Sequence, residues 1–386
     1  MKNIEFLIFF SIVFVLYTAI NYYIFIRGYQ VISQIQWAKS IYIPLYLVLY
    51  LSFLANIILI HKYPSFLSNQ IAFIGNFWLA AILYLFLAVV LLDILRLINH
   101  FIPFFPAFVV NNYALTKQIS GALIILTVFV TLFWGYKNAN SPELKTIDIK
   151  IPRKTVKLDR LRIVAASDVH LRSLCSNNFS EKLASDINKL NPDIILFPGD
   201  LMDESIEPVI KFGLGEPLKQ LKSKYGTYAI TGNHEYIGGI NQTTSYIESL
   251  GIKILRDEFI LIDNEIYLIG REDRAIKQFA KMTRKSLKDI MSKVDKTKPL
   301  LLLDHQPFGL NEAQENGIDF QLSGHTHHGQ LFPINFITNK IYEVSWGYLK
   351  KGNTQYYVSS GYGTWGPPVR TGNHPELLLI NLYFEK

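Results

Sequence analysis

The chain has 386 residues, more than one ordinary domain holds, and half of them are hydrophobic, with a mean hydropathy of +0.20. Its 38 basic and 31 acidic side chains give a formal net charge of +7, which is too balanced for the concentrated basic face of a nucleic-acid-binding protein. The single cysteine, Cys175, excludes an intramolecular disulfide and says nothing about the compartment.

Residues 1–136 are predicted to be a four-helix transmembrane region. They contain only two acidic residues, Glu5 and Asp93. Uncharged apolar runs cover residues 6–26, 40–60, 71–92 and 118–136, each about 20 residues long, which is the length that crosses a bilayer as a helix. Tyrosines and tryptophans gather near the run ends, as interfacial anchors do. The segment 101–110, which two prolines interrupt, is too short to span and is expected at the interface.

The charges near these runs leave two questions open. Asp93 and Arg96 stand at i and i+3 at the end of the third run, where such a pair marks an ion path or, as we favour, snorkels to the membrane edge. Four spans put both ends of the region on one side, and the flanking basic residues slightly favour a cytoplasmic location for the rest of the chain. We therefore expect a multi-pass membrane protein whose C-terminal part lies in the cytoplasm.

Residues 137–149 are interpreted as a linker, centred on 138–143, and an entry strand, and residues 150–386 as an α/β domain. Hydrophobic spacing predicts strands at 147–151, 161–166, 194–197, 225–230, two or three within 252–269, 300–303, 356–359 and 377–382. It predicts helices at 179–190, 206–222 and 276–294. Strands that alternate with helices indicate α/β sheets, which bind ligands in the crevice beyond the carboxyl ends of their strands.

Side chains of metal-binding types follow strand after strand. The stretch 324–330, GHTHHGQ, follows an apolar strand and carries histidines at i and i+2, which alone would more often be two surface histidines. Other loops supply further ligands, however, so that five strand ends collect Asp168, His170, Asp200, Asn233, His305, His325 and His327. This set favours two divalent ions of the Mn, Fe, Zn or Co type over Mg or Ca. A carboxylate such as Asp200 can bridge two ions about 3.5–4 Å apart, the arrangement that displaces groups at phosphorus.

These motifs resemble, in chain order, the five signatures of calcineurin-like metallophosphoesterases. The matching residues are Asp168-x-His170, Gly199-Asp200-x-x-Asp203, Gly232-Asn233-His234-Glu235, His305 and Gly324-His325-x-His327. The tail at 360–376 looks like the bacterial membrane-associated branch of the family. The resemblance covers about 150–386 and implies an α/β domain with a β-sandwich core flanked by helices. The N-terminal all-α membrane bundle lies outside the resemblance and is predicted from the apolar runs alone.

The resemblance also implies a role for each motif residue. One ion would be held by Asp168, His170 and His327, the second by Asn233, His305 and His325, and Asp200 would bridge them. His234 is similar to the family's catalytic histidine, which steadies the phosphoryl group and protonates the leaving oxygen. Asp203 or Glu235 would orient that histidine.

Other polar residues admit two interpretations. Asp203 could instead cap the helix after it, and His328 could be an ordinary loop residue rather than a substrate contact. Arg271 and Arg370 could each grip phosphate as a bidentate fork, although surface arginines are common. The basic residues of 277–298 are expected to form a solvated helix face, with docking on anionic headgroups as the alternative.

The sequence thus predicts a membrane-anchored, dinuclear metal-dependent phosphoesterase that works by attack of a hydroxide shared between the two ions. Lipid-linked or headgroup phosphates are the favoured substrates because the tether confines the site to the vicinity of the membrane. Pyrophosphate cleavage of a nucleotide-linked lipid is one specific version, which the resemblance to some family members implies. The alternative is a membrane receptor or transport partner that binds a phosphorylated ligand without turnover, against which the intact His234 argues. In a third interpretation the four helices are the functional part and the phosphoesterase regulates them.

Overall fold

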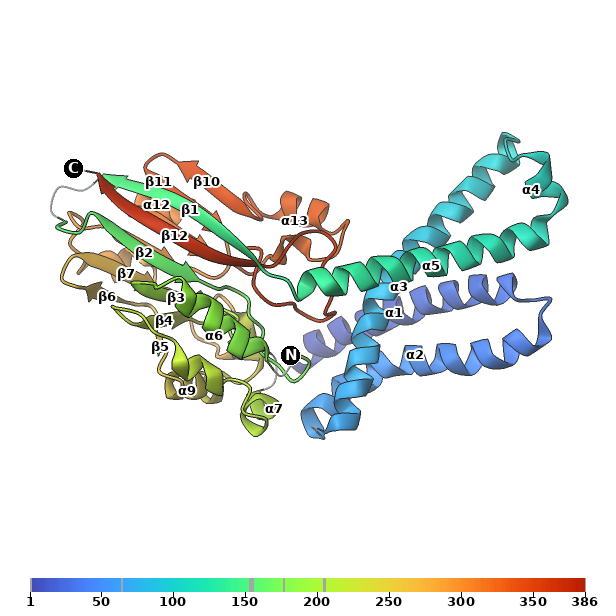
Figure 1. Cartoon of the computed structure of the whole chain (residues 1–386), viewed down its shortest axis with the longest axis horizontal. Coiled ribbons are helices and arrows are strands. Elements are labelled where there is room, and N and C mark those ends of the chain that lie inside the picture. Colours follow the sequence, from blue (N-terminus) through green and yellow to red (C-terminus); the bar gives the residue numbers. More distant parts are fainter. Residues whose placement is uncertain (1, 64, 153–155, 176–177, 204–205, 386) are drawn as a thin grey trace. The chain divides into compact units, whose positions relative to one another are not determined.

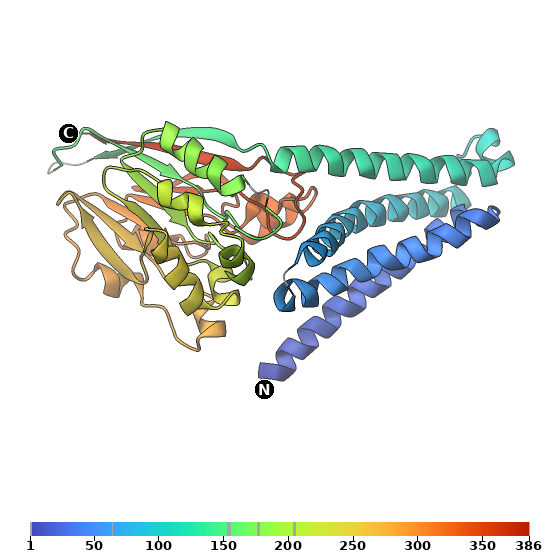
Figure 2. The same cartoon turned by 60° about the horizontal axis from the view of Figure 1, so that its bottom comes forward.

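The computed structural model describes residues 2–63, 65–152, 156–175, 178–203 and 206–385. The chain divides into two compact units, residues 1–135 and residues 136–386. Figures 1 and 2 show the helices of the first unit and the sheets of the second.

The first unit is helical. Its helices are α1 (Lys2–Val31), α2 (Gln36–Lys62), α3 (Phe66–Phe101), the short α4 (Ala107–Asn111) and α5 (Tyr113–Ala139), which continues into the second unit. Among the described residues, four of these helices are long and apolar enough to cross a membrane, and the four predicted runs lie within them. The helices extend past the runs because backbone groups near a bilayer are satisfied best inside a helix. The chain is therefore a multi-pass membrane protein.

Polar contacts and a glycine join the first three helices. The backbone carbonyl of Asn21 on α1 accepts a hydrogen bond from the hydroxyl of Tyr46 on α2 at 2.7 Å, and its side-chain oxygen accepts from Nε1 of Trp78 on α3 at 3.1 Å. A Cβ at Gly75 would lie 2.8 Å from Cα of Phe53, so a glycine is required where α2 and α3 approach most closely.

The second unit contains two six-stranded sheets. The first has the order β1 (Glu143–Pro152), β12 (Glu376–Glu385), β2 (Arg160–Ala165), β3 (Ile194–Pro198), β4 (Thr227–Ile230), β5 (Lys253–Ile254). The second has the order β10 (Gly347–Lys351), β11 (Thr354–Val358), β9 (Phe320–Ser323), β8 (Leu300–Leu303), β7 (Ile266–Gly270), β6 (Glu258–Ile262). Strands β2 to β5 are mutually parallel, as are β7, β8, β9 and β11. Their carboxyl ends therefore meet at one edge of each sheet.

The two sheets bury a shared hydrophobic core, in which Ile163 and Leu196 of the first sheet join Leu303 and Leu322 of the second. The outer face of the first sheet is covered by α6 (Phe179–Lys189) and α9 (Ile240–Ser249), and that of the second by α11 (Leu287–Met291) and α12 (Asn311–Glu315). Because both faces are covered, the central strands are continuous apolar runs. The predicted β-sandwich core flanked by helices is confirmed.

The prediction of one continuous helix at 276–294 is wrong. The segment contains α10 (Ile276–Phe279) and, further on, α11, with irregular chain between them. Lys281 adopts a left-handed backbone (φ 55°), and Arg284 turns inward to donate to Asp304 at 2.9 Å. The basic residues of this segment consequently do not share one helical face.

Two other predicted boundaries also change. The helix expected at 206–222 is split into α7 (Ile206–Lys211) and the 3₁₀ helix η1 (Glu216–Gln220), because Gly213 between them has a φ of 62°. The expected linker at 138–143 shortens, because α5 continues to Ala139 and β1 begins at Glu143.

Candidate metal centre

Five strand ends bring the predicted ligands together. The parallel neighbours β2, β3 and β4 lead into the loops of Asp168, Asp200 and Asn233. The parallel neighbours β8 and β9 of the other sheet lead to His305 and His325. The backbone N–H of His325 donates to both carboxylate oxygens of Asp168, at 2.8 and 3.1 Å. The edges of the two sheets therefore form one site.

Five of the predicted ligands have a left-handed backbone. The φ angles are 51° at Asp168, 47° at His170, 52° at Asp200, 72° at His325 and 45° at His327. Such a conformation costs about 1–3 kcal/mol for a residue other than glycine and is found mostly where function requires it. Aspartate and histidine adopt it more readily than bulky residues do. These sharp reversals let short loops turn their side chains toward a common point.

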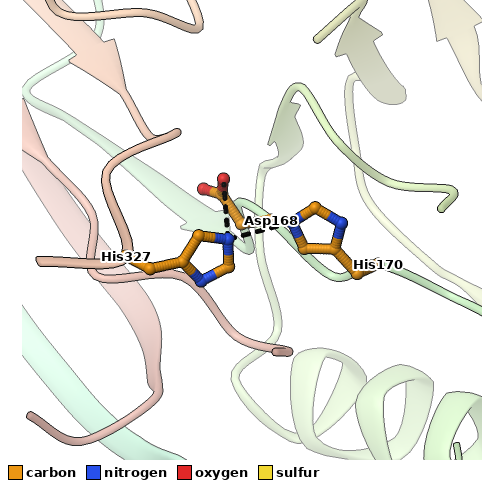
Figure 3. A group of neighbouring side chains, drawn as sticks. All are labelled: Asp168, His170 and His327. Atoms are coloured by element: carbon orange, nitrogen blue, oxygen red, sulfur yellow. Dashed lines mark hydrogen bonds and ion pairs between the residues drawn. The ribbon is translucent and has the colours of Figure 1, made fainter. Parts of the chain in front are cut away.

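Asp168, His170 and His327 form the first group (Figure 3). The Nε2 atoms of the two histidines are 2.9 Å apart, and Nε2 of His327 is 3.6 Å from Oδ1 of Asp168. All three side chains are buried, and their ligand atoms lie within 4.8 Å of one another. One cation with bonds of about 2.0–2.2 Å could contact all three.

Asp200, His305 and His325 form the second group, with ligand atoms again within 4.8 Å of one another. Nδ1 of His305 contacts the carbonyl of Pro198 at 2.8 Å, which directs its Nε2 to Oδ2 of Asp200 at 3.0 Å. The same oxygen of Asp200 is 3.8 Å from Nε2 of His170 in the first group. Asp200 thus lies between the two groups, where a bridging ligand would be.

The side-chain oxygen of Asn233 is a buried hydrogen-bond acceptor. Among the described residues, no hydrogen-bond donor meets its side-chain oxygen. An unsatisfied buried acceptor costs about 1–3 kcal/mol, so its presence needs an explanation. A divalent cation would supply that partner, and the imidazole, carboxylate and amide donors of the cluster suit such an ion. The residues present therefore fit two metal ions.

Two glycines allow the ligands to approach each other. A Cβ at Gly232 would overlap the carboxylate of Asp200, and a Cβ at Gly324 would overlap Asp168 and Ser167. No other residue therefore fits at either position without displacing a predicted ligand.

His234 and Asp203 lie beside both groups. Nδ1 of His234 is 2.8 Å from Oδ1 of Asp203, and the rings of His234 and His170 are 4.6 Å apart. The other oxygen of Asp203 accepts from Nη1 of Arg172 at 3.2 Å. Asp203 lies 3.5 Å from Nδ1 of His170 as well, so one buried carboxylate contacts two imidazoles.

Glu235, the other residue expected to orient His234, has a different set of contacts. Its carboxylate accepts from the backbone N–H groups of Gly232 at 2.7 Å, Met202 at 3.0 Å and Asp200 at 3.1 Å. It therefore ties the loop after β3 to the loop after β4. Burial raises the pKa of this carboxyl to about 7.

Comparisons with known proteins identify the family. The family model "Calcineurin-like phosphoesterase" matches residues 161–329. An uncharacterized metallophosphoesterase of Campylobacter jejuni is 30% identical over 384 residues, which is 99% of this chain and 100% of that protein. The chain belongs to the calcineurin-like metallophosphoesterases. A second uncharacterized metallophosphoesterase, from Helicobacter pylori, is 39% identical over 258 residues, 65% of this chain and 67% of that protein.

A more distant relative has a named substrate. The UDP-2,3-diacylglucosamine pyrophosphatase of Chlamydia muridarum is 25% identical over 332 residues, 69% of this metallophosphoesterase and 98% of that protein. The comparisons confirm the predicted family and the predicted enzyme class, a metal-dependent phosphoric ester hydrolase. As in the family, the cofactors of this metallophosphoesterase are two divalent metal ions, and the two Asp and His groups have the composition and spacing to hold such ions.

The electrostatics of the cluster favour metal binding. Burial raises the pKa of Asp200, but the charges of His305 and His234 outweigh it and hold that pKa well below its usual range. Burial lowers the pKa of His325 to about 3, and burial with repulsion from His170 lowers that of His327. Both rings are therefore neutral at neutral pH, which is the form that binds metal.

His305 is the exception among these ligands. Burial lowers its pKa, but the neighbouring Asp200 carboxylate outweighs burial and raises the pKa well above its usual value. If His305 holds a metal ion, binding of that ion would release a proton from this residue.

Arg370 lies behind His327 and is fully buried. Nη2 of Arg370 is 3.1 Å from Nδ1 of His327, Nε donates to the carbonyl of Gly363 at 3.1 Å, and Nη1 donates to Asn373 at 2.6 Å. A guanidinium only donates, so Nδ1 of His327 accepts in this arrangement. The guanidinium that could have gripped phosphate is therefore engaged by the protein, and Arg370 contacts a predicted ligand instead.

The other two predicted substrate contacts also have protein partners. Arg271 is buried, and its guanidinium donates to Glu312 at 2.6 Å and to the carbonyl of Lys285 at 3.0 Å, and lies 3.6 Å from Asp304. Nδ1 of His328 contacts the hydroxyl of Ser345 at 2.7 Å. The guanidinium of Arg271 is thus engaged by the protein, and the role of His328 as a substrate contact stays a prediction.

Three residues of the site escaped the sequence analysis. Arg172 holds Asp203, Asn373 donates to the carbonyls of His327 and His328, and the ring of Trp365 lies 6.0 Å from that of His234. Arg172 lies only two residues after His170, which was a usable signal. For Asn373 and Trp365 the sequence offered only their position in the glycine-rich tail.

Proposed function

We propose that the chain is a membrane-anchored dinuclear phosphoesterase in which Asp200 bridges the two ions. Asp168, His170 and His327 would hold one ion, and Asn233, His305 and His325 the other. The position of Asp200 carries this proposal, because a single oxygen lies 3.0 Å from His305 and 3.8 Å from His170. The bound ions would supply an acidified water for attack at phosphorus and would neutralise the phosphoryl oxygens.

His234 would transfer the proton, and Asp203 would keep the imidazole of His234 in orientation. Nδ1 of His234 lies 2.8 Å from Oδ1 of the ionised Asp203, and this ion pair would hold the imidazole in place beside the phosphoryl group and the leaving oxygen. His234 would protonate that oxygen as a general acid, a role that contributes about 10²–10⁴-fold. Burial raises the pKa of Asp203, but hydrogen bonds from His170 and His234 and the charge of Arg172 hold it well below its usual range. Asp203 therefore stays charged at neutral pH.

The substrate class we favour is a lipid-linked phosphate ester or pyrophosphate. Trp365, with half of its surface exposed, borders His234, and the exposed ring of Trp346 lies 5.4 Å from that of His328. Exposed indoles beside a polar site suit a substrate with an apolar part. The four apolar helices keep the chain in the bilayer, and a relative is named for its action on UDP-2,3-diacylglucosamine.

Metal reloading tests the chemistry. Full-length protein in detergent is stripped of metal, reloaded with Mn, Fe, Zn or Co, and assayed with p-nitrophenyl phosphate and bis-p-nitrophenyl phosphate to separate monoesterase from diesterase activity. We expect turnover only after metal is added, and a loss of about 100-fold or more for Asp200→Asn. Asp186→Asn is the matched control, since Asp186 is paired with Lys189 on the surface. A folded protein without turnover on any divalent metal would refute the proposal.

A second assay tests the substrate class. Turnover of a nucleotide-linked diacyl sugar in mixed micelles is compared with turnover of the same nucleotide sugar without acyl chains. We expect kcat/KM to favour the lipid by about tenfold or more, since each buried CH₂ contributes about 0.8 kcal/mol. Equal values would refute the lipid preference and leave the phosphoesterase activity intact.

His234→Ala separates an enzyme from a receptor or transport partner. An enzyme variant loses turnover and keeps its metal, whereas a pure binder keeps its ligand affinity and its cellular role.

We also propose that residues 137–386 face the cytoplasm, as the basic residues flanking the spans favour. Protease added to spheroplasts should then leave this part intact, and digestion would place it outside.

A further inference from the structure

A second polar site lies in the membrane unit, far along the chain from the metal ligands. A cavity of about 480 Å³ is lined by Arg27, Asp93, Arg96, Leu97, Tyr113 and Lys117, among others. Arg27 lies near the end of α1, Arg96 near the end of α3 and Lys117 near the start of α5. These helix ends lie at the same end of the bundle in both views (Figures 1 and 2).

The charges that line the cavity do not balance. Asp93 accepts from the hydroxyl of Tyr23 at 2.6 Å, and it pairs with Arg27 at 2.6 Å and with Arg96 at 3.0 Å. One carboxylate therefore faces two guanidinium groups. Lys117 adds a third cation, and in the described part of the chain it has no ion pair, only the ring of Tyr113 at 5.2 Å. The lining thus has a net charge of about +2.

Snorkelling explains why a single basic side chain lies at a membrane edge, but it does not explain why two basic side chains converge on one carboxylate. Snorkelling side chains extend separately toward water, whereas two arginines from different helices here turn toward one aspartate. Asp93 engages one nitrogen of each guanidinium, and a guanidinium has five N–H donors. Nη1 of Arg27 also donates to Gln30 at 3.1 Å. Asp93 therefore orders the two guanidinium groups, and the N–H donors that neither Asp93 nor Gln30 engages remain for a ligand.

We propose that this cavity binds a phosphate group. A phosphate monoester carries about −1.5 to −2 charges near neutral pH and three acceptor oxygens, which match the net charge and the donors of the lining. Arg27 lies four residues before the end of α1 and Lys117 four residues after the start of α5, or about 6 Å from each helix end at 1.5 Å per residue. The exposed Leu97 and Tyr113 at the rim offer contacts to acyl chains. A lipid headgroup and a free phosphate are both chemically suited to this lining.

Native mass spectrometry of the full-length protein in detergent tests this site. Phosphatidic acid is titrated against phosphatidylcholine for wild type, Lys117→Gln, Lys117→Arg and Lys39→Gln. Lys39 is the matched control because its ammonium lies over Tyr29 at 5.7 Å and does not line the cavity. We expect phosphatidic acid to bind preferentially, about tenfold more weakly to Lys117→Gln, and about as tightly to Lys117→Arg and Lys39→Gln as to wild type.

Competition with inorganic phosphate distinguishes the two sources of the ligand. If millimolar phosphate displaces phosphatidic acid from wild type, the cavity recognises the free anion, and if it does not, the cavity requires the lipid. Either result supports a phosphate site only when Lys117→Gln weakens the binding. Binding of phosphatidic acid that is no stronger than that of phosphatidylcholine, or that is equal in wild type, Lys117→Gln and Arg96→Gln, would overturn the proposal.

Discussion

Replacing Asp203 by asparagine should separate the proton-transfer machinery from the metal ligands. Asparagine keeps the size of the side chain but removes the charge that faces Nδ1 of His234 at 2.8 Å. A hydrogen bond to a charged group contributes about 1.5–3 kcal/mol, which corresponds to roughly 10- to 150-fold in rate. The contact of Asp203 with His170 is longer, at 3.5 Å, so metal affinity should fall by less than about tenfold.

The assay for Asp203→Asn measures kcat with p-nitrophenyl phosphate at saturating Mn, together with metal content by elemental mass spectrometry. Arg172→Gln is the companion variant, because Arg172 contacts the opposite oxygen of Asp203 at 3.2 Å and should cost less rate. The reasoning is refuted if Asp203→Asn keeps kcat within about twofold of wild type at full metal occupancy. A loss of rate that merely follows a loss of metal would refute it equally.

Three further predictions follow from the same site. Asn233→Ala should lower bound metal from about two ions per chain toward one, and Asn233→Asp should restore it, as elemental analysis would show. Gly232→Ala should abolish metal uptake, because its Cβ would overlap Asp200, whereas Gly317→Ala, with open space around it, should only lower stability by about 1 kcal/mol. Chelation should lower the melting temperature of the second unit by roughly 5–10 °C, reversibly with Mn, since saturating ligand contributes about 2.7 kcal/mol. Each expectation fails if the variant or the metal-free protein matches wild type.

The β-sandwich and the residues of the candidate metal centre could be predicted because the sequence patterns that indicate them are short and local. Strands such as β8, with four consecutive buried leucines, are recognisable from a few residues, and each is followed directly by its ligand. Parallel pairing then brings the strand ends together, whatever lies between them in the chain. Prediction therefore required only recognising five short blocks and their order.

The parts that could not be predicted depend on contacts that are distant in sequence. The apolar spacing of 276–294 fits a helix, but the inward turn of Arg284 depends on Asp304, which lies 20 residues away. Similarly, nothing near Arg370 in the sequence distinguishes a fully buried arginine from a surface one, because its partner His327 lies 43 residues earlier. The contact of Asp93 with Arg27 joins two different membrane helices and was missed for the same reason.

The pairing of β1 with β12 constrains how this protein is made. Residues Glu143 to Pro152 align in parallel with Glu376 to Glu385, 233 residues downstream, and β2 pairs with the other side of β12. At about 5–20 residues per second, the ribosome needs on the order of 10–50 s to supply the missing strand. During that interval β1 lacks its partner strand, so the backbone N–H and C=O groups along that edge are unpaired. A stop codon placed just before β12 should therefore yield inserted but proteolytically labile protein rather than a smaller working enzyme.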